Sequence, residues 1–194
     1  MSVNPQEVLT FWLDECGPEQ WYAQDDTLDR QIHARFHPAW EQAAAGRYAL
    51  WLTYPSGALA YLILTDQFPR NMFRGAPESF QLDSVALAVA KSAIAKGWDL
   101  RIDPPARQFF YLPLMHSENL CDQSRCVRLI CERMPDQGGS NLIHARAHRD
   151  VIRQFGRFPY RNATLGRQSS AAELAYIEAG GYGSTLRALE PAAA

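Results

Sequence analysis

The stretch NPQEVLTFWLDECG, residues 4–17, carries a complete set of signals for one α-helix. Asn4 is a typical N-cap residue, Pro5 follows at the first helical position, and Glu7 closes a capping box. Apolar residues then recur at helical spacing until Gly17 ends the segment. The chain therefore opens with a helix, and the same signals recur along the rest of the sequence.

Later segments show helical signals of the same kind. Apolar residues at helical spacing predict a helix that begins near residues 25–27 and ends at Gly46, with a kink or a split at Pro38. Further helices are expected over residues 56–68, 77–97, 103–113, 119–134, 141–155 and 170–179. No stretch alternates apolar and polar residues as a half-buried strand does. We therefore expect at least seven helices, packed as antiparallel neighbours because the linkers are short, and no β-sheet.

No stretch is typical of a linker between two domains. The sequence thus predicts an all-α fold of antiparallel helix pairs, in one domain over residues 1–180. Residues 181–194 follow Gly180 and end in Pro-Ala-Ala-Ala, and we expect them to form a flexible C-terminal tail.

Composition and charge argue against several classes of protein. The 194 residues carry a formal net charge of −2, the wrong balance for a protein that coats DNA or binds membranes through a polybasic surface. No apolar run reaches the roughly 18 residues that a membrane-spanning helix needs. The four cysteines form no CxxC pair, and we interpret them as reduced thiols in a cytoplasmic protein. Arginine dominates the basic residues, which suggests recognition of a carboxylate or phosphate.

Two segments share the pattern Phe-Pro followed by Arg-Asn. The first is Asp66-Gln67-Phe68-Pro69-Arg70-Asn71, and the second is Phe158-Pro159-Tyr160-Arg161-Asn162. Such a repetition is typical of helix-pair arrays of the tetratricopeptide type. In one interpretation each proline ends a helix, and the arginine and asparagine bind the carbonyl groups left at its C-terminus. In the other, both segments present these polar side chains to one shared groove.

A third polar segment lies at a helix–helix junction, from Leu112 to Gln123. His116 and Glu118 could act there as an acid and a base, or Glu118 could cap the helix that follows. A Ser–His–acid triad is not supported, because adjacent side chains project about 100° apart on a helix and no nucleophile elbow is present.

His144 and His148 stand four residues apart, as in half of a metal site. The glutamate of the H-E-x-x-H motif is missing, so the sequence does not predict a metal site or a zinc protease. Helical projection places both histidines on an apolar stripe that faces the core or a pocket. A buried, hydrogen-bonded histidine and a ligand-binding histidine are both compatible with this position.

These motifs, in this order, resemble a bacterial family known as domain of unknown function 924. The resemblance rests on the Asp66–Asn71 string, on the Pro113–Gln123 segment and on the run from His148 to Arg167, and it covers roughly residues 4 to 180. It implies an all-helical, tetratricopeptide-like fold and establishes no activity, substrate or cofactor. Tyr160 stands where the family often has a histidine, which weakens any mechanism that needs proton transfer there.

Two classes of function are compatible with these features. The first is a binding module with an Arg/His/Glu-lined groove for a peptide, a protein partner or a small anionic ligand. The second is an enzyme that acts on a small phosphate or carboxylate substrate by acid–base catalysis. We expect no cofactor, no metal and no membrane partner, and the sequence does not favour nucleic acid. The candidate ligand-binding residues are Asp66, Gln67, Arg70, Asn71, His116, Glu118, Gln123, His148, Arg157, Arg161, Asn162 and Arg167.

Overall fold

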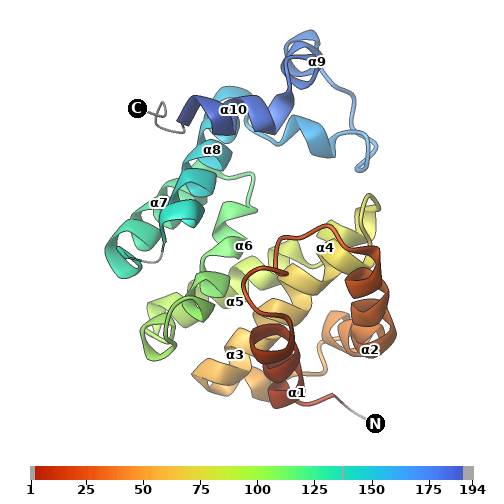
Figure 1. Ribbon diagram of the computed structural model, residues 1–194, viewed down its shortest axis with the longest axis vertical. Helices are drawn as coiled ribbons and strands as arrows, with labels where there is room; N and C mark the ends of the chain where they lie inside the picture. Colours follow the sequence, from red (N-terminus) through yellow and green to blue (C-terminus); the bar gives the residue numbers. More distant parts are fainter. Residues whose placement is uncertain (1–2, 137, 190–194) are drawn as a thin grey trace. The chain divides into compact units, whose positions relative to one another are not determined.

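The computed structural model describes residues 3–136 and 138–189, and these residues are helical or irregular throughout (Figure 1). No strand occurs within those two ranges, which confirms the all-α class. The chain forms two compact units, one ending at Pro113 and the other beginning at Leu114. We call them unit 1 and unit 2 and describe each by itself. The single domain and the tetratricopeptide-like arrangement stay predictions.

Unit 1 contains five α-helices joined by shorter helical turns. In chain order they are α1 (Pro5–Leu9), the π-helical turn η1 (Thr10–Cys16), α2 (Asp26–Ala44), η2 (Ala49–Thr53), α3 (Pro55–Leu62), the π-helical turn η3 (Ile63–Gln67), α4 (Phe68–Met72), η4 (Pro77–Phe80), α5 (Asp83–Ala95), η5 (Asp99–Arg101) and η6 (Ala106–Phe110).

The core of unit 1 is aromatic. Phe11 of η1 lies 5.1 Å from Phe36 of α2, measured between ring centroids. Phe68 at the start of α4 lies 4.7 Å from Phe36 and 5.3 Å from Trp12. Residues 57–64, within the helix expected over residues 56–68, are all buried. Aromatic pairs at these distances stabilise the fold by more than the free energy gained from burying their apolar surface.

The local signals at the first helix are confirmed. Asn4 accepts a hydrogen bond from the backbone N–H of Glu7, and the Glu7 side chain accepts one from the backbone N–H of Asn4, which completes the capping box. Gly17 follows with φ of 74°, a left-handed conformation that residues with a Cβ adopt at a cost.

Two prolines behave differently from the expectation. Pro38 lies inside a continuous α2, so the predicted split is wrong. Pro69 does not end a helix either, because α3, η3 and α4 follow one another directly from residue 55 to residue 72. The backbone N–H of Phe68 bonds to the carbonyl of Ile63, five residues back, in a wider π-helical turn. This turn accommodates a proline that has no N–H to donate, and Arg70 therefore lies within α4.

The described residues of unit 2 form five α-helices and one 3₁₀ turn. They are α6 (Leu112–Met115), whose first two residues belong to unit 1, α7 (Leu120–Arg133), α8 (Gly139–Phe155), the 3₁₀ turn η7 (Pro159–Arg161), α9 (Ala171–Glu178) and α10 (Gly181–Leu189). α8 packs against both α7 and α10. Asn119 caps α7 and Ser170 caps α9 through a capping box, at the starts of the helices expected over residues 119–134 and 170–179.

The C-terminal segment differs from the expected flexible tail. Residues 181–189 form α10, and Tyr182 packs on His148 of α8, 4.7 Å between ring centroids. The glycines at 180 and 181 both have positive φ, so they form the turn between α9 and α10 instead of ending the fold. The prediction is wrong for these residues, and residues 190–194 lie outside the described part.

Two further properties bear on the sequence predictions. All four cysteines lie in described residues and none forms a disulfide. In the described part of the chain, no helix combines the length and the apolar character that crossing a membrane requires.

Candidate functional site

The candidate residues fall into two sets, one in each unit. Unit 1 holds Asp66, Gln67, Arg70 and Asn71. Unit 2 holds His116, Glu118, Gln123, His148, Arg157, Arg161, Asn162 and Arg167. A single site that combines both sets stays a prediction, and the contacts within each set are described separately.

The set in unit 1 is built around the carboxylate of Asp66, which is 1% exposed. The π-helical turn η3 places Asp66 directly before α4, so that Arg70 follows one helical turn later and donates to it at 3.3 Å. The same guanidinium nitrogen donates to Asp83 at 2.8 Å, and the Gln67 amide donates to Asp66. Burial opposes the charge of Arg70, but Asp66 and Asp83 outweigh it and raise the Arg70 pKa.

Asn71 and Tyr22 extend this set. Asn71 donates to Asp29 of α2 at 2.8 Å, which joins α4 to α2. The hydroxyl of Tyr22 donates to Gln108. Desolvation of this hydroxyl, together with the charge of Asp66, raises the Tyr22 pKa above its ordinary value, although the residue as a whole is 60% exposed. Motif spacing gave no indication of Tyr22 or Asp29, because their partners are distant in the sequence.

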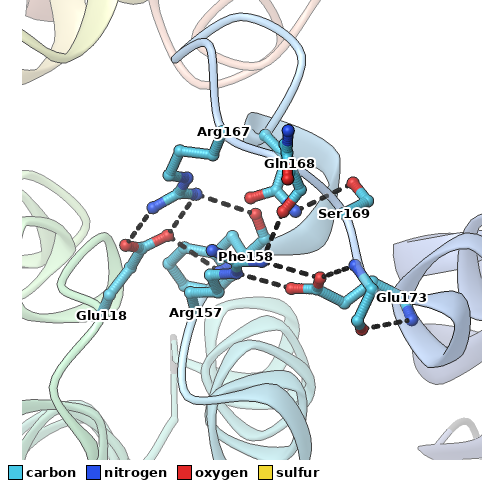
Figure 2. A network of polar contacts seen from close by, with 9 residues as sticks. Glu118, Arg157, Phe158, Arg167, Gln168, Ser169 and Glu173 are labelled. Atoms are coloured by element: carbon cyan, nitrogen blue, oxygen red, sulfur yellow. Dashed lines mark hydrogen bonds and ion pairs between the residues drawn. The ribbon is translucent and has the colours of Figure 1, made fainter.

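The set in unit 2 contains a network around Glu118 (Figure 2). Arg167 donates to both oxygens of the Glu118 carboxylate, at 2.7 and 2.9 Å, in a bidentate pair. The backbone N–H of Phe158 donates to the same carboxylate at 2.8 Å. Burial alone would raise the pKa of Glu118, but these donors outweigh it and lower the pKa. Glu118 therefore holds the loop after α8 in place. Of the two alternatives for this residue, the one in which it caps α7 is wrong, because Asn119 is the N-cap.

Arg157 forms a second bidentate pair in Figure 2, with Glu173 of α9. The two nitrogen–oxygen distances are 2.6 and 2.8 Å, and Arg157 also donates to the carbonyl of Gln168. Glu173 accepts from the backbone N–H of Ser170 as well, so one carboxylate closes the capping box and binds the guanidinium. The bond from Arg157, followed by that from Ser170, lowers the pKa of Glu173. The capping box was evident in the sequence, whereas the pairing with Arg157 was not.

Gln123 and Asn162 hold backbone and loop segments within unit 2. The amide of Gln123 donates to the carbonyls of Met115 and Ser117, at 2.6 and 2.7 Å. Asn162 donates to the hydroxyl of Ser169 at 3.0 Å. Both side chains are buried, and these contacts give them a structural role.

His116, His148, Arg161 and Tyr182 lie together, and we call them the His148 cluster. Arg161, which is 7% exposed, donates to the backbone carbonyl of His116 at 3.1 Å. Its guanidinium carbon lies 4.4 Å from the ring centroid of Phe158, in a cation–π contact. The rings of His116 and His148 are 6.5 Å apart, and the ring of Tyr182 lies 4.7 Å from His148. The cluster thus combines residues from α8, η7, α10 and the segment before α7.

The imidazole of His148 is held in one orientation. Its Nδ1 lies 2.9 Å from the backbone carbonyl of His144, and because a carbonyl only accepts, Nδ1 must donate. Burial lowers the pKa of His148 to about 3, with smaller contributions from the charges of His116 and Arg161. The ring is therefore neutral at pH 7, with the lone pair on Nε2.

The lowered pKa of His148 predicts acid sensitivity. In the unfolded chain this histidine takes up a proton near its ordinary pKa of 6.5, whereas in the folded protein its pKa is about 3. Between these values the unfolded state holds more protons, so the free energy of unfolding falls as the pH falls. We expect a loss of about 2 kcal/mol between pH 7 and pH 5, measured by urea denaturation. The variant His148→Asn keeps a hydrogen-bond donor but does not titrate, so its free energy of unfolding should fall by less over this pH range. An equal fall in the variant and the wild type would contradict the lowered pKa of His148.

Two residues of unit 2 that were not among the candidates from the sequence, Tyr182 and Glu173, contribute to the contacts described above. Tyr182 was assigned to the tail, although an aromatic residue after a glycine pair could have indicated an anchored helix. Glu173 was recognised only as a cap. Within the described ranges, no group of three His, Cys, Asp or Glu residues could hold a metal ion.

Comparisons with known proteins agree with the fold. A solved structure of a protein of unknown function from Agrobacterium tumefaciens is similar to this chain, with a TM-score of 0.85 and 38% sequence identity, over 91% of this chain and 97% of that one. No curated protein matches the sequence. The profile of a family described as bacterial proteins of unknown function, DUF924, matches residues 8–181. The chain therefore belongs to this family, as the three sequence motifs had indicated.

Proposed function

We propose that unit 2 is a binding module for a small anion, a phosphate or a carboxylate, at the His148 cluster. One observation carries the proposal: a buried guanidinium, that of Arg161, lies beside a histidine that is neutral at pH 7. Both side chains contact the ring of Phe158, the guanidinium of Arg161 at 4.4 Å and the ring of His148 at 5.3 Å from the ring centroid, so the two lie close to each other. The arginine supplies attraction for an anion, and the histidine supplies an acceptor.

The chemistry of the pair restricts the ligand. The guanidinium of Arg161 favours an anionic oxygen, and Nε2 of His148 favours a group that donates a hydrogen. A hydrogenphosphate, a phosphate monoester or a hydroxycarboxylate carries both. The local charge of residues 125–167 favours such a ligand too, because this segment contains nine arginines and three acids.

Arg161 donates to the carbonyl of His116, and the other arginines of the motifs bind carboxylates. Arg157 binds Glu173, Arg167 binds Glu118, and Arg70 binds Asp66 and Asp83. A guanidinium whose donors already bind a carboxylate has less capacity for a ligand. The proposal therefore narrows the candidate ligand contacts to the His148 cluster and assigns these pairs to the stability of the fold.

Acid–base catalysis on a small phosphate or carboxylate substrate is the second candidate function, and the fixed orientation of His148 favours it. A neutral imidazole whose Nδ1 donates to a carbonyl can accept a proton at Nε2. A pKa of about 3 makes it a weak base at pH 7, however, because catalytic bases work best near the operating pH. Glu118 is less suited, since Arg167 and Phe158 already donate to its carboxylate. Binding is therefore the better-supported function.

The proposal is tested by thermal unfolding at pH 7 in inorganic phosphate, against sodium chloride of the same ionic strength. Phosphate at about ten times its Kd should stabilise the protein by about 1.4 kcal/mol, which raises the Tm by about 3–6 °C. Arg161→Gln and His148→Asn should each abolish most of this rise, because each removes one ligand contact.

Arg153→Gln is the matched control. Arg153 lies on the exposed side of α8 and pairs with Asp150 at 3.0 Å, so its removal takes away the same charge outside the cluster. The control should keep the full response to phosphate. An equal rise in wild type and both cluster variants, or no rise in wild type up to about 50 mM, would contradict the proposal.

A further inference from the structure

A groove of about 670 Å³ opens on unit 1, away from all the motif residues. It lies between the start of α1, the face of α2 that carries Arg35 and Pro38, and the segment from Arg47 to Trp51. Its volume is within the range of natural sites for small molecules.

The floor of the groove is apolar. Pro38, Ala39 and Trp51 line it, and the ring of Tyr48 stacks on Trp51 with centroids 4.3 Å apart. Leu50 lines it as well and is 80% exposed. Apolar residues that line a groove favour a ligand with a hydrocarbon part, because binding removes apolar surface from water.

The charge at the groove is positive. Arg35 and Arg47 line it, and none of the described lining residues is acidic. Arg35 is held by Glu15 at 2.8 Å, and its guanidinium lies over the ring of Phe11. Arg47 is exposed and follows the end of α2, which makes it the better donor for a ligand.

The sequence fixes the place of Arg47. α2 ends in a left-handed turn at Gly46, where φ is 74°. The backbone N–H of Arg47 bonds back to the carbonyl of Gln42, and that of Gly46 bonds to Ala43, as in a Schellman motif. Arg47 and Gln42 are thereby held next to each other at the groove.

A second groove beside α2 offers a comparison of opposite charge. It has a volume of about 770 Å³, and it is lined by Glu41 and Glu78 together with Trp40 and Phe73. None of its described lining residues is a lysine or an arginine. An anion should therefore distinguish the two grooves, since both offer aromatic surface but only the first offers guanidinium groups.

We propose that the groove at Arg47 binds a free small-molecule carboxylate with an apolar tail. The carboxylate binds the guanidinium of Arg47, because this planar group matches it with two parallel hydrogen bonds. The tail lies along Pro38, Leu50 and Trp51. Such a ligand satisfies both the charge and the apolar floor, whereas a simple anion or a neutral hydrocarbon satisfies only one of them.

The test is isothermal titration calorimetry of the full chain with octanoate at pH 7. Octanamide, which has the same tail without the charge, and acetate, which lacks the tail, should each bind at least about tenfold more weakly. Arg47→Gln should weaken octanoate binding about tenfold, and Leu50→Ser should weaken it as well. Both positions are exposed, so the variants should keep the Tm of the wild type within about 2 °C.

Glu41→Gln, in the acidic groove, is the control and should bind octanoate like the wild type. The titrations are repeated in the Arg161→Gln background, which removes the anion site proposed for unit 2, and the dependence of octanoate binding on Arg47 and on the tail should persist there. Equal affinity for octanoate and octanamide, unchanged affinity in Arg47→Gln, or no octanoate binding to the wild type would overturn the proposal.

Discussion

Replacing Arg70 with methionine is expected to lower the free energy of unfolding by about 3 kcal/mol at pH 7. The substitution keeps an apolar stem of similar length but removes the guanidinium that donates to Asp66 and Asp83. Asp66 is almost completely buried, so its carboxylate would lose a charged donor in a place that water hardly reaches. Urea denaturation of the variant and the wild type measures the difference.

Arg74→Met provides the comparison, because Arg74 lies four residues further and pairs with Asp29 in a more exposed position. Its loss should cost no more than about 1 kcal/mol. Adding Asp66→Asn to Arg70→Met should restore part of the lost stability, since the buried negative charge is then removed as well. If Arg70→Met and Arg74→Met lower the free energy of unfolding by the same amount, Arg70 is not needed to stabilise the buried carboxylate of Asp66.

Glu118→Ala is expected to cost about 2 kcal/mol of unfolding free energy, because it removes the bidentate partner of Arg167 and the acceptor for the N–H of Phe158. The pair is about one quarter exposed, at 24% for Arg167 and 28% for Glu118, so solvent screening keeps the value below that of a fully buried pair. A double-mutant cycle with Arg167→Ala should give a coupling energy of about 1 kcal/mol.

The pH dependence of this coupling has a definite sign. The pKa of Glu118 is lowered in the folded protein, so the pair stabilises the fold above the ordinary glutamate value of 4.5. The coupling should be lost as the pH falls through the lowered pKa. Glu132→Ala on α7, an exposed glutamate 4.0 Å from Arg128, should change the stability by less than about 0.5 kcal/mol at any pH. A coupling energy of zero at pH 7 would show that the loop after α8 is held by other contacts.

The sequence predicted the helices best where both partners of an interaction lie within a few residues. Asn4 caps the first helix as expected, and Gly17 ends it in a left-handed turn. Asn119 and Ser170 cap two further helices where these were expected to begin. A capping bond spans two or three residues, so it depends little on the rest of the fold. The effect of Pro69 was predicted less well, because the wider turn η3 that accommodates it depends on how the buried segment 57–67 packs.

The residues of the candidate site were predicted from the sequence, but the pairing of each arginine with a particular carboxylate was not. Asp66 and Glu118 were named among the candidate ligand-binding residues, and neither was assigned to a particular arginine. The structure pairs Asp66 with Arg70, four residues away, which helical spacing allows. It pairs Glu118 with Arg167 and Arg157 with Glu173, which are 49 and 16 residues apart.

By itself, then, the sequence determined the helical class, most helix ends and the supply of polar side chains at the junctions, because short-range hydrogen bonds and apolar spacing decide these. Only the tertiary structure decided which guanidinium binds which carboxylate, which histidine stays neutral and where Tyr182 packs. These properties depend on burial and on contacts between segments far apart in the chain. The energy of a buried charge is set by the groups that surround it in space, and no pattern of neighbours along the sequence contains that information.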